Sequence, residues 1–246
     1  MQSILIITCI GLSVGMMGTG LGGLITFLMK TPSKKFLSFI LGISGGLMLS
    51  IVCFDLLPEA FDLGQLYVGI IGILIGVGTI IGLDEVLDQK VKVHSSDIKN
   101  DFIKTGILLG LGVAMHNFPE GLAIGSGFMA TKELGIGISI VIALHNMPEG
   151  ISMGTPMSIG GLGRWRIFLY TIFAGIPMGI GAFIGAFLGE ISKNFIAFCL
   201  AFAGGTMLYI TCGELIPKSQ SLKNKNTSNL GFVLGFIMGV ILTEIL

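Results

Sequence analysis

The sequence predicts an all-α integral membrane protein with eight transmembrane helices. Of its 246 residues, 52% are hydrophobic and only 11% are charged, and the mean hydropathy of +0.93 lies far outside the range of soluble proteins. The apolar residues run in long stretches of helical periodicity, without the series of short alternating strands that a membrane β-barrel needs. We therefore expect a bundle of membrane-spanning helices.

Eight apolar stretches are long enough to cross a bilayer, since a transmembrane helix needs about 20 residues. They cover residues 4–29, 36–61, 64–84, 103–128, 134–158, 165–189, 194–217 and 230–246. No charge precedes Lys30, so the first stretch lacks the basic segment of a cleaved signal peptide, and we expect it to be retained as a helix. We expect residues 1–246 to form one transmembrane domain.

Positive charges are concentrated in alternate connections. Twelve of the fourteen follow the first, third, fifth and seventh stretches, at Lys30, Lys34, Lys35, Lys90, Lys92, Lys99, Lys104, Arg164, Arg166, Lys218, Lys223 and Lys225. Only Lys132 and Lys193 lie in the other connections. Because positive residues accumulate on the cytoplasmic side, we expect both termini on the extracytoplasmic side of the plasma membrane.

Glycines recur every two to four residues in the sixth stretch, at Gly175, Gly179, Gly181 and Gly185. Helices in lipid associate through small residues that let their backbones approach, so this pattern predicts a tightly packed helix face. It does not match a nucleotide-binding fingerprint, and we expect no nucleic-acid partner.

A six-residue motif occurs twice, as HNFPEG from His116 and as HNMPEG from His145. Residues four apart share one face of a helix, so each histidine should lie beside the glutamate of its own copy, Glu120 or Glu149. The copies are symmetrical about the polar turn at residues 130–131. Two antiparallel helices joined there would hold all four side chains at one depth in the membrane.

These four side chains are suited to a divalent cation, because two carboxylates and two neutral imidazoles carry a charge that such an ion cancels. An ionisable group at this depth without a partner is costly. The ligand types favour zinc first, with iron, manganese, cobalt and cadmium as alternatives. Asn117 and Asn146 could add amide oxygens, while Pro119 and Pro148 would free backbone carbonyls one turn earlier. The alternative is a pair of buried His–Glu hydrogen bonds that only clip helices together.

A second repeat relates the second and seventh stretches. Residues 44–58 match residues 203–217 at eight of fifteen positions and align Asp55 with Glu214. The expected topology inverts the two copies, as in secondary transporters that open a midplane site to each side in turn. We hypothesise that the two acids relay metal, Asp55 at the outer mouth and Glu214 at the cytoplasmic mouth; the alternative is that they cap or pair at helix ends. Met48, which aligns with a second methionine, is a candidate fifth ligand.

The doubled motif on consecutive helices resembles that of the ZIP (Zrt/Irt-like) divalent-metal transporters, nearest to their GufA-like bacterial branch. The resemblance covers almost the whole chain and implies an inverted-repeat bundle in a 3+2+3 arrangement. It implies a first metal position made by His116, Glu120, His145 and Glu149, and a second made by Asn117, Glu120, Asn146 and Glu149. Relatives with two metals carry a glutamate before the proline of the sixth helix. This chain has Ile176 there, which disfavours a well-occupied second position.

The sequence therefore predicts a carrier that moves Zn²⁺ or a related divalent cation into the cytoplasm, with protons competing for the paired carboxylates. The expected partners are the lipid bilayer, the metal ions and a second copy in a homodimer. No prosthetic group and no enzymatic activity are expected. Two alternatives stay open, a membrane-embedded zinc metalloenzyme and a metal-selective channel. Four protein ligands without a spare general base argue against the first, and inverted repeats favour a carrier over the second.

Overall fold

The computed structural model describes residues 2–29, 33–91, 98–222 and 225–245, and all of their regular structure is helical. The long α-helices are α1 (Gln2–Met29), α2 (Lys34–Ile51), α4 (Leu66–Val91), α5 (Ile98–Ala130), α6 (Lys132–Ile159), α9 (Lys193–Ile210) and α11 (Lys225–Ile245). The shorter segments are α3 (Leu57–Leu63), α7 (Arg164–Ala174), α8 (Ile176–Ile191), α10 (Ile216–Ser221) and two π-helical turns, η1 (Val52–Leu56) and η2 (Thr211–Leu215).

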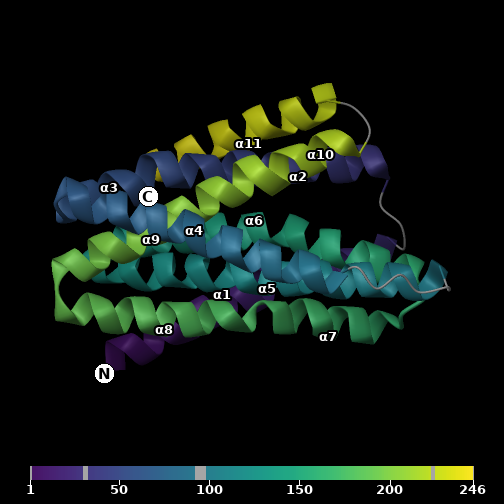
Figure 1. The fold of residues 1–246 in the computed structure, drawn as a ribbon, viewed down its shortest axis with the longest axis horizontal. Helices are drawn as coiled ribbons and strands as arrows, with labels where there is room; N and C mark the ends of the chain where they lie inside the picture. Colours follow the sequence, from purple (N-terminus) through teal and green to yellow (C-terminus); the bar gives the residue numbers. More distant parts are fainter. Residues whose placement is uncertain (1, 30–32, 92–97, 223–224, 246) are drawn as a thin grey trace.

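Eight stretches of the described helices are long and apolar enough to cross a membrane. Three of them join several segments, with α2, η1 and α3 forming the second, α7 and α8 the sixth, and α9, η2 and α10 the seventh. The helices lie side by side along the long axis of the molecule, and both chain termini lie at one end (Figure 1), here called the terminus end. The predicted eight-helix membrane fold is confirmed.

The α5–α6 hairpin occupies the centre of the bundle. Its two helices meet at Thr131, whose hydroxyl caps α6 by accepting a hydrogen bond from the backbone N–H of Leu134. The hairpin packs with α1, α7 and α8, while α2 pairs with α11 and α4 pairs with α9. Because α2 also contacts α6 and α9 also contacts α5, each of these flanking pairs reaches the hairpin.

Glycines bring the hairpin and its neighbours into backbone contact. A Cβ atom on Gly181 of α8 would collide with the carbonyl oxygen of Phe118 on α5, and one on Gly121 of α5 would collide with Met178. On the other helix of the hairpin, a Cβ on Gly150 would collide with the carbonyl of Thr19 on α1. The last residue of each six-residue motif is therefore a packing contact, as the small-residue pattern predicts.

The repeat found in the second and seventh spans extends to their backbone. The turns η1 and η2 occupy equivalent positions, and each is followed by a proline, Pro58 or Pro217. A proline lacks the N–H for the ordinary helical bond and its ring clashes with the carbonyl four residues earlier, so widening of the preceding turn relieves the conflict. The second span runs toward the terminus end and the seventh runs away from it (Figure 1), so the copies are inverted.

The sixth span contains a break that the prediction of one helix over residues 165–189 missed. It is divided at Gly175, which ends α7, and Pro177 lies in the first turn of α8. By contrast, α5 and α6 remain helical through Pro119 and Pro148. Glycine weakens a helix and proline lacks a backbone donor, so Gly175 and Pro177 favour a break. Gly154 and Pro156 have the same spacing within the continuous helix α6, so the local sequence alone does not explain why the sixth span breaks.

Candidate metal site

Three of the predicted ligands form a compact buried cluster at the centre of the hairpin. Glu120 of α5 and His145 and Glu149 of α6 each offer a ligand atom, and these atoms lie within 4.8 Å of one another. His145 Nε2 lies 3.1 Å from Glu120 Oε1 and 3.5 Å from Glu149 Oε1. The exposed fractions of Glu120, His145 and Glu149 are 0%, 1% and 4%.

The second oxygen of each carboxylate in this cluster lacks a protein partner. Glu120 Oε2 and Glu149 Oε2 are buried and accept no hydrogen bond. Buried charged groups without partners are strongly unfavourable, and two carboxylates this close also repel each other. A cation bound between them would satisfy both oxygens, so the donor set fits a divalent metal with mixed oxygen and nitrogen ligands.

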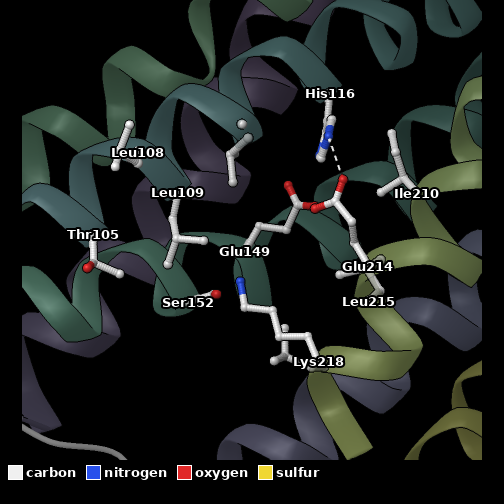
Figure 2. Close-up of a pocket in the computed structure, with 13 residues that line it drawn as sticks. Thr105, Leu108, Leu109, His116, Glu149, Ser152, Ile210, Glu214, Leu215 and Lys218 are labelled. Atoms are coloured by element: carbon white, nitrogen blue, oxygen red, sulfur yellow. Dashed lines mark ion pairs between the residues drawn. The ribbon is translucent and has the colours of Figure 1, made fainter. Parts of the chain in front are cut away.

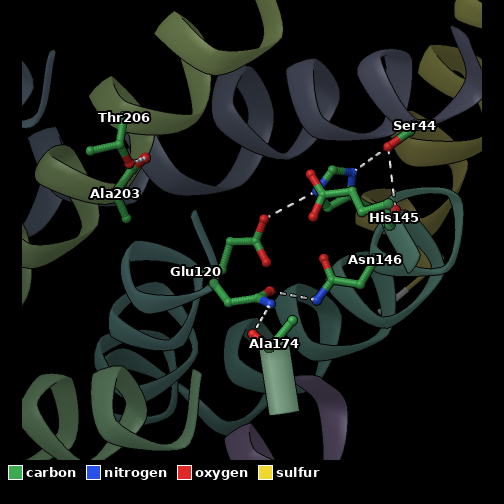
Figure 3. A network of polar contacts seen from close by, with 9 residues as sticks. Ser44, Glu120, His145, Asn146, Ala174, Ala203 and Thr206 are labelled. Carbon is green, nitrogen blue, oxygen red and sulfur yellow. Dashed lines mark hydrogen bonds and ion pairs between the residues drawn. The ribbon is translucent and has the colours of Figure 1, made fainter. Parts of the chain in front are cut away.

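Ser44 of α2 orients the imidazole of His145 (Figure 3). Its hydroxyl oxygen lies 2.5 Å from His145 Nδ1, and it donates a hydrogen bond of 3.3 Å to the carbonyl oxygen of the same residue. This geometry fits a proton on Nδ1, which Ser44 accepts, and leaves the lone pair of Nε2 facing Glu120. Such an outer hydrogen bond is the usual way in which a ligating histidine is held.

Ser44 lies outside the HNxPEG motifs and is not among the predicted site residues, although the repeat distinguishes it. In the alignment of residues 44–58 with 203–217, Ser44 matches Ala203. Ser44 therefore places a hydroxyl where the other copy has a methyl group.

His116, the fourth predicted ligand of the first position, lies outside the compact cluster. Its Nε2 atom is 3.5 Å from Glu214 Oε1 of η2, and its side chain is 8% exposed. Figure 2 shows His116 directed at Glu214, with the Glu149 carboxylate beside that of Glu214. In this conformation the histidines of the two motifs therefore face different carboxylates.

The two asparagines form a hydrogen-bonded chain that ends at the break between α7 and α8 (Figure 3). Asn117 Nδ2 donates to the carbonyl oxygen of Ala174 at 2.7 Å, and Asn146 Nδ2 donates to Asn117 Oδ1 at 3.0 Å. A carbonyl can only accept, so it fixes the orientation of both amides. The oxygen of Asn117 is thereby used, whereas Asn146 Oδ1 is buried without a hydrogen-bond partner. Ile176, the residue before Pro177, is 38% exposed.

A cavity of about 460 Å³ leads from the cluster toward the end opposite the termini. It is lined by Glu149, His116, Glu214 and Lys218, and also by Thr105 near the start of α5 (Figure 2). The predicted relay acid Glu214 therefore lies in the same cavity as one member of the cluster.

A second cavity, of about 360 Å³, lies at the terminus end and is acidic. The predicted relay acid Asp55 lines it, together with Glu59, Asp62 and Glu133. The hydroxyl of Thr243 on α11 donates a 2.8 Å hydrogen bond to Asp55 Oδ2.

Fully buried apolar side chains separate this acidic cavity from the cluster. On α2, Met48 and Ile51 lie between Ser44 and Asp55, and on α6 Ile138 and Ile142 lie between the cavity and His145. The candidate ligand Met48 is 1% exposed and belongs to the hydrophobic core.

The chain matches the family model described as ZIP zinc transporter over residues 84–243. It is 32% identical over 239 residues to the zinc transporter ZupT of Corynebacterium glutamicum, with 89% of this chain and 91% of the relative covered. It is 31% identical to ZupT of Akkermansia muciniphila, covering 90% and 91%, and 33% identical to ZupT of Salmonella paratyphi A, covering 90% of each. The chain belongs to the ZIP family.

Membership in the ZIP family confirms the resemblance drawn from the doubled motif. As a ZIP protein with eight membrane-spanning helices, it is a multi-pass plasma-membrane transporter of divalent metal ions. The family match includes α5 and α6 and therefore the whole buried cluster.

Proposed function

We propose that this ZIP protein carries Zn²⁺ into the cytoplasm by alternating access, with Glu120, His145 and Glu149 as the metal ligands. The single observation that carries the proposal is the buried cluster with its unpartnered carboxylate oxygens, open to one cavity and closed from the other. The names of the relatives favour zinc as the substrate, and the mixed nitrogen and oxygen ligands suit it. Iron, manganese, cobalt and cadmium are the competing ions.

The distribution of positive charge supports the direction of transport. Lys34, Arg164, Lys218 and Lys225 lie near the end opposite the termini, where the cavity of the cluster also leads. Three further residues counted in that charge bias, Lys30, Lys92 and Lys223, lie outside the described residues. Under the positive-inside rule this end is cytoplasmic and both termini are extracytoplasmic. The conformation is then inward-facing.

The two relay acids would serve the two faces of the membrane. Glu214 receives metal from Glu149 in the inward-facing cavity, and Asp55 collects metal in the acidic cavity on the other side, where several carboxylates concentrate cations. Exchange of the inverted repeats would seal the first cavity and open the second. His116 then leaves Glu214 and joins the cluster as its fourth ligand.

The asparagines support a single main metal position. Asn117 holds Asn146 in place, and the free oxygen of Asn146 serves a metal that binds toward α7 and α8. A second ion there gains one amide oxygen and shares Glu120 and Glu149 with the first. With Ile176 in place of an acid, we propose that this second position binds metal weakly. Met48 remains a predicted fifth ligand, and the homodimer remains a prediction.

The test is metal uptake into proteoliposomes over a panel of divalent ions. Wild type should transport Zn²⁺ with saturation at a modest rate, and Glu120→Gln should remove both uptake and metal binding. Glu85→Gln, which neutralises an exposed acid on α4, is the matched control and should behave as wild type. Normal saturable uptake by Glu120→Gln would refute the site. Uptake that does not saturate would favour the channel, and metal-dependent hydrolysis of lipid or peptide lost in His145→Ala would favour the metalloenzyme.

A further inference from the structure

Lys218 is a cationic side chain in the cavity through which we propose that metal cations leave. It lines the cavity together with Glu149 and Glu214, and Figure 2 shows its ammonium nitrogen pointing into the space beside Glu149 and Ser152. Lys218 follows Glu214 by four residues, so the two side chains lie on one face of the seventh span. A fixed positive charge on the proposed transport path would repel a passing divalent cation, and the proposed function assigns Lys218 no role.

The inverted repeat gives Lys218 a counterpart of opposite charge. In the alignment that pairs Asp55 with Glu214, the next residue after the shared proline is Glu59 in one copy and Lys218 in the other. Glu59 lines the acidic cavity, and Lys218 lines the cavity of the cluster. The two mouths thus share a backbone, with a π-helical turn and a proline, but have opposite charges at equivalent positions.

We propose that Lys218 is a tethered cation that competes with the metal for Glu149 and Glu214 and so promotes metal release into this cavity. This inference rests on the proposed function of the cluster. When the metal leaves, the ammonium group of Lys218 partly balances the negative charge of the carboxylates that the metal had bound. When the metal is present, the two like charges repel each other across a cavity whose walls are largely apolar, where such forces are stronger than in water.

Lys218 competes with the metal only in the conformation whose cavity joins α10 to the cluster. A charge on α10 acts on the cluster only when the cavity joins them, so Lys218 lowers the free energy of the empty, open form relative to the metal-bound one. A group that interacts with one state shifts the equilibrium toward that state. Lys218 therefore gives low metal affinity on its own side of the membrane, while Glu59 in the acidic cavity favours capture on the other side.

A graded set of substitutions tests this inference. Lys218→Arg keeps the charge, Lys218→Met removes it from a side chain of similar length, and Lys218→Glu reproduces the residue of the other copy. Zn²⁺ affinity is measured by isothermal titration on purified protein, and the KM and maximal rate are measured in proteoliposomes. Lys225→Met removes an exposed charge from the same end of the molecule and is the matched control.

We expect Lys218→Met to bind Zn²⁺ at least about fivefold more tightly than wild type and Lys218→Glu more tightly still, since each step removes repulsion or adds attraction at short range. In transport, KM and maximal rate should fall together, because release becomes slow. Lys218→Arg and Lys225→Met should match wild type. The difference between Lys218→Met and wild type should shrink at high ionic strength, because salt screens it.

Equal affinity in wild type, Lys218→Met and Lys218→Glu would overturn the inference, as would a similar loss of binding in every variant, which indicates a structural role. If Lys218→Glu does not purify as a folded protein, Lys218→Met and Lys218→Arg still decide the question. Glu120→Gln separates this failure from that of the proposed function. If Glu120→Gln binds Zn²⁺ as wild type does, the proposed site is wrong; if it does not bind and the Lys218 series is flat, only the role of Lys218 is wrong.

Discussion

The two ends of the molecule share one backbone pattern but differ in whether the cavity at that end extends to the buried cluster. Each has a π-helical turn with an acid, Asp55 in η1 and Glu214 in η2, followed by a proline. The cavity of Glu214 extends to Glu149 of the buried cluster, whereas the cavity of Asp55 is closed from it by apolar side chains. The repeat therefore sets the local backbone of both ends, while packing of the spans decides which end is connected to the buried cluster.

The largest expected effect tests whether metal binds at the buried cluster between the two ends. Glu149→Gln removes one charge and lines the open cavity, so it should lower Zn²⁺ affinity by at least about 100-fold, beyond the usual cost of losing an outer-shell contact. Uptake should be abolished. Isothermal titration and proteoliposome uptake measure the two effects. Retention of wild-type affinity would mean that metal binds elsewhere. The two cavities could then no longer be compared by their access to the metal.

Much of this fold follows from local sequence. Long apolar runs fix the number of spans because a bilayer requires a minimum helix length, and the second HNxPEG motif places His145 beside Glu149 because residues four apart share a helix face. The repeat of residues 44–58 also has a counterpart in the backbone, because the equivalent turns η1 and η2 lie just before Pro58 and Pro217. Each of these is a consequence of spacing along the chain.

The remaining features depend on contacts between distant segments. His116 pairs with Glu214, nearly one hundred residues away, because the seventh span approaches α5 in this conformation. Ser44 reaches His145 across the α2–α6 contact. The Asn117 amide donates a hydrogen bond to the Ala174 carbonyl, which is free to accept it because the sixth span breaks at Gly175. No spacing rule could assign these partners, since each requires the relative placement of spans.

The next effect concerns the one side chain that links the second span to the cluster. Ser44→Ala should weaken Zn²⁺ binding by about 10- to 100-fold, because loss of an outer hydrogen bond lets the ligating imidazole of His145 reorient. Ser50→Ala is the matched control on α2, since its hydroxyl bonds only to the Leu47 carbonyl of its own helix. Isothermal titration decides the outcome, and equal affinities in the two variants would exclude an orienting role for Ser44.

Acidity should weaken metal binding in the same cluster. Metal needs deprotonated ligands, so binding at Glu120, His145 and Glu149 must displace any protons they carry. Lowering the pH from about 7.5 to about 5.5 adds protons to the competing form and should reduce the Zn²⁺ affinity by about tenfold or more. Titration at both pH values tests this, and an affinity independent of pH would contradict it.

The smallest expected effects separate the two mouths directly. Asp55→Asn should reduce uptake about two- to fivefold at limiting external Zn²⁺ and little at saturation, because a carboxylate in an acidic cavity raises the local cation concentration. Glu214→Gln should instead lower the maximal rate, since its carboxylate lies beside Glu149 in the cavity through which we propose that metal leaves. Glu244→Gln, an exposed acid at the terminus end, is the control. If both variants change the same kinetic constant, the two acids do not act on opposite sides of the site. If neither changes uptake at limiting metal, they are helix-end partners, as the hydrogen bond from Thr243 to Asp55 would then indicate.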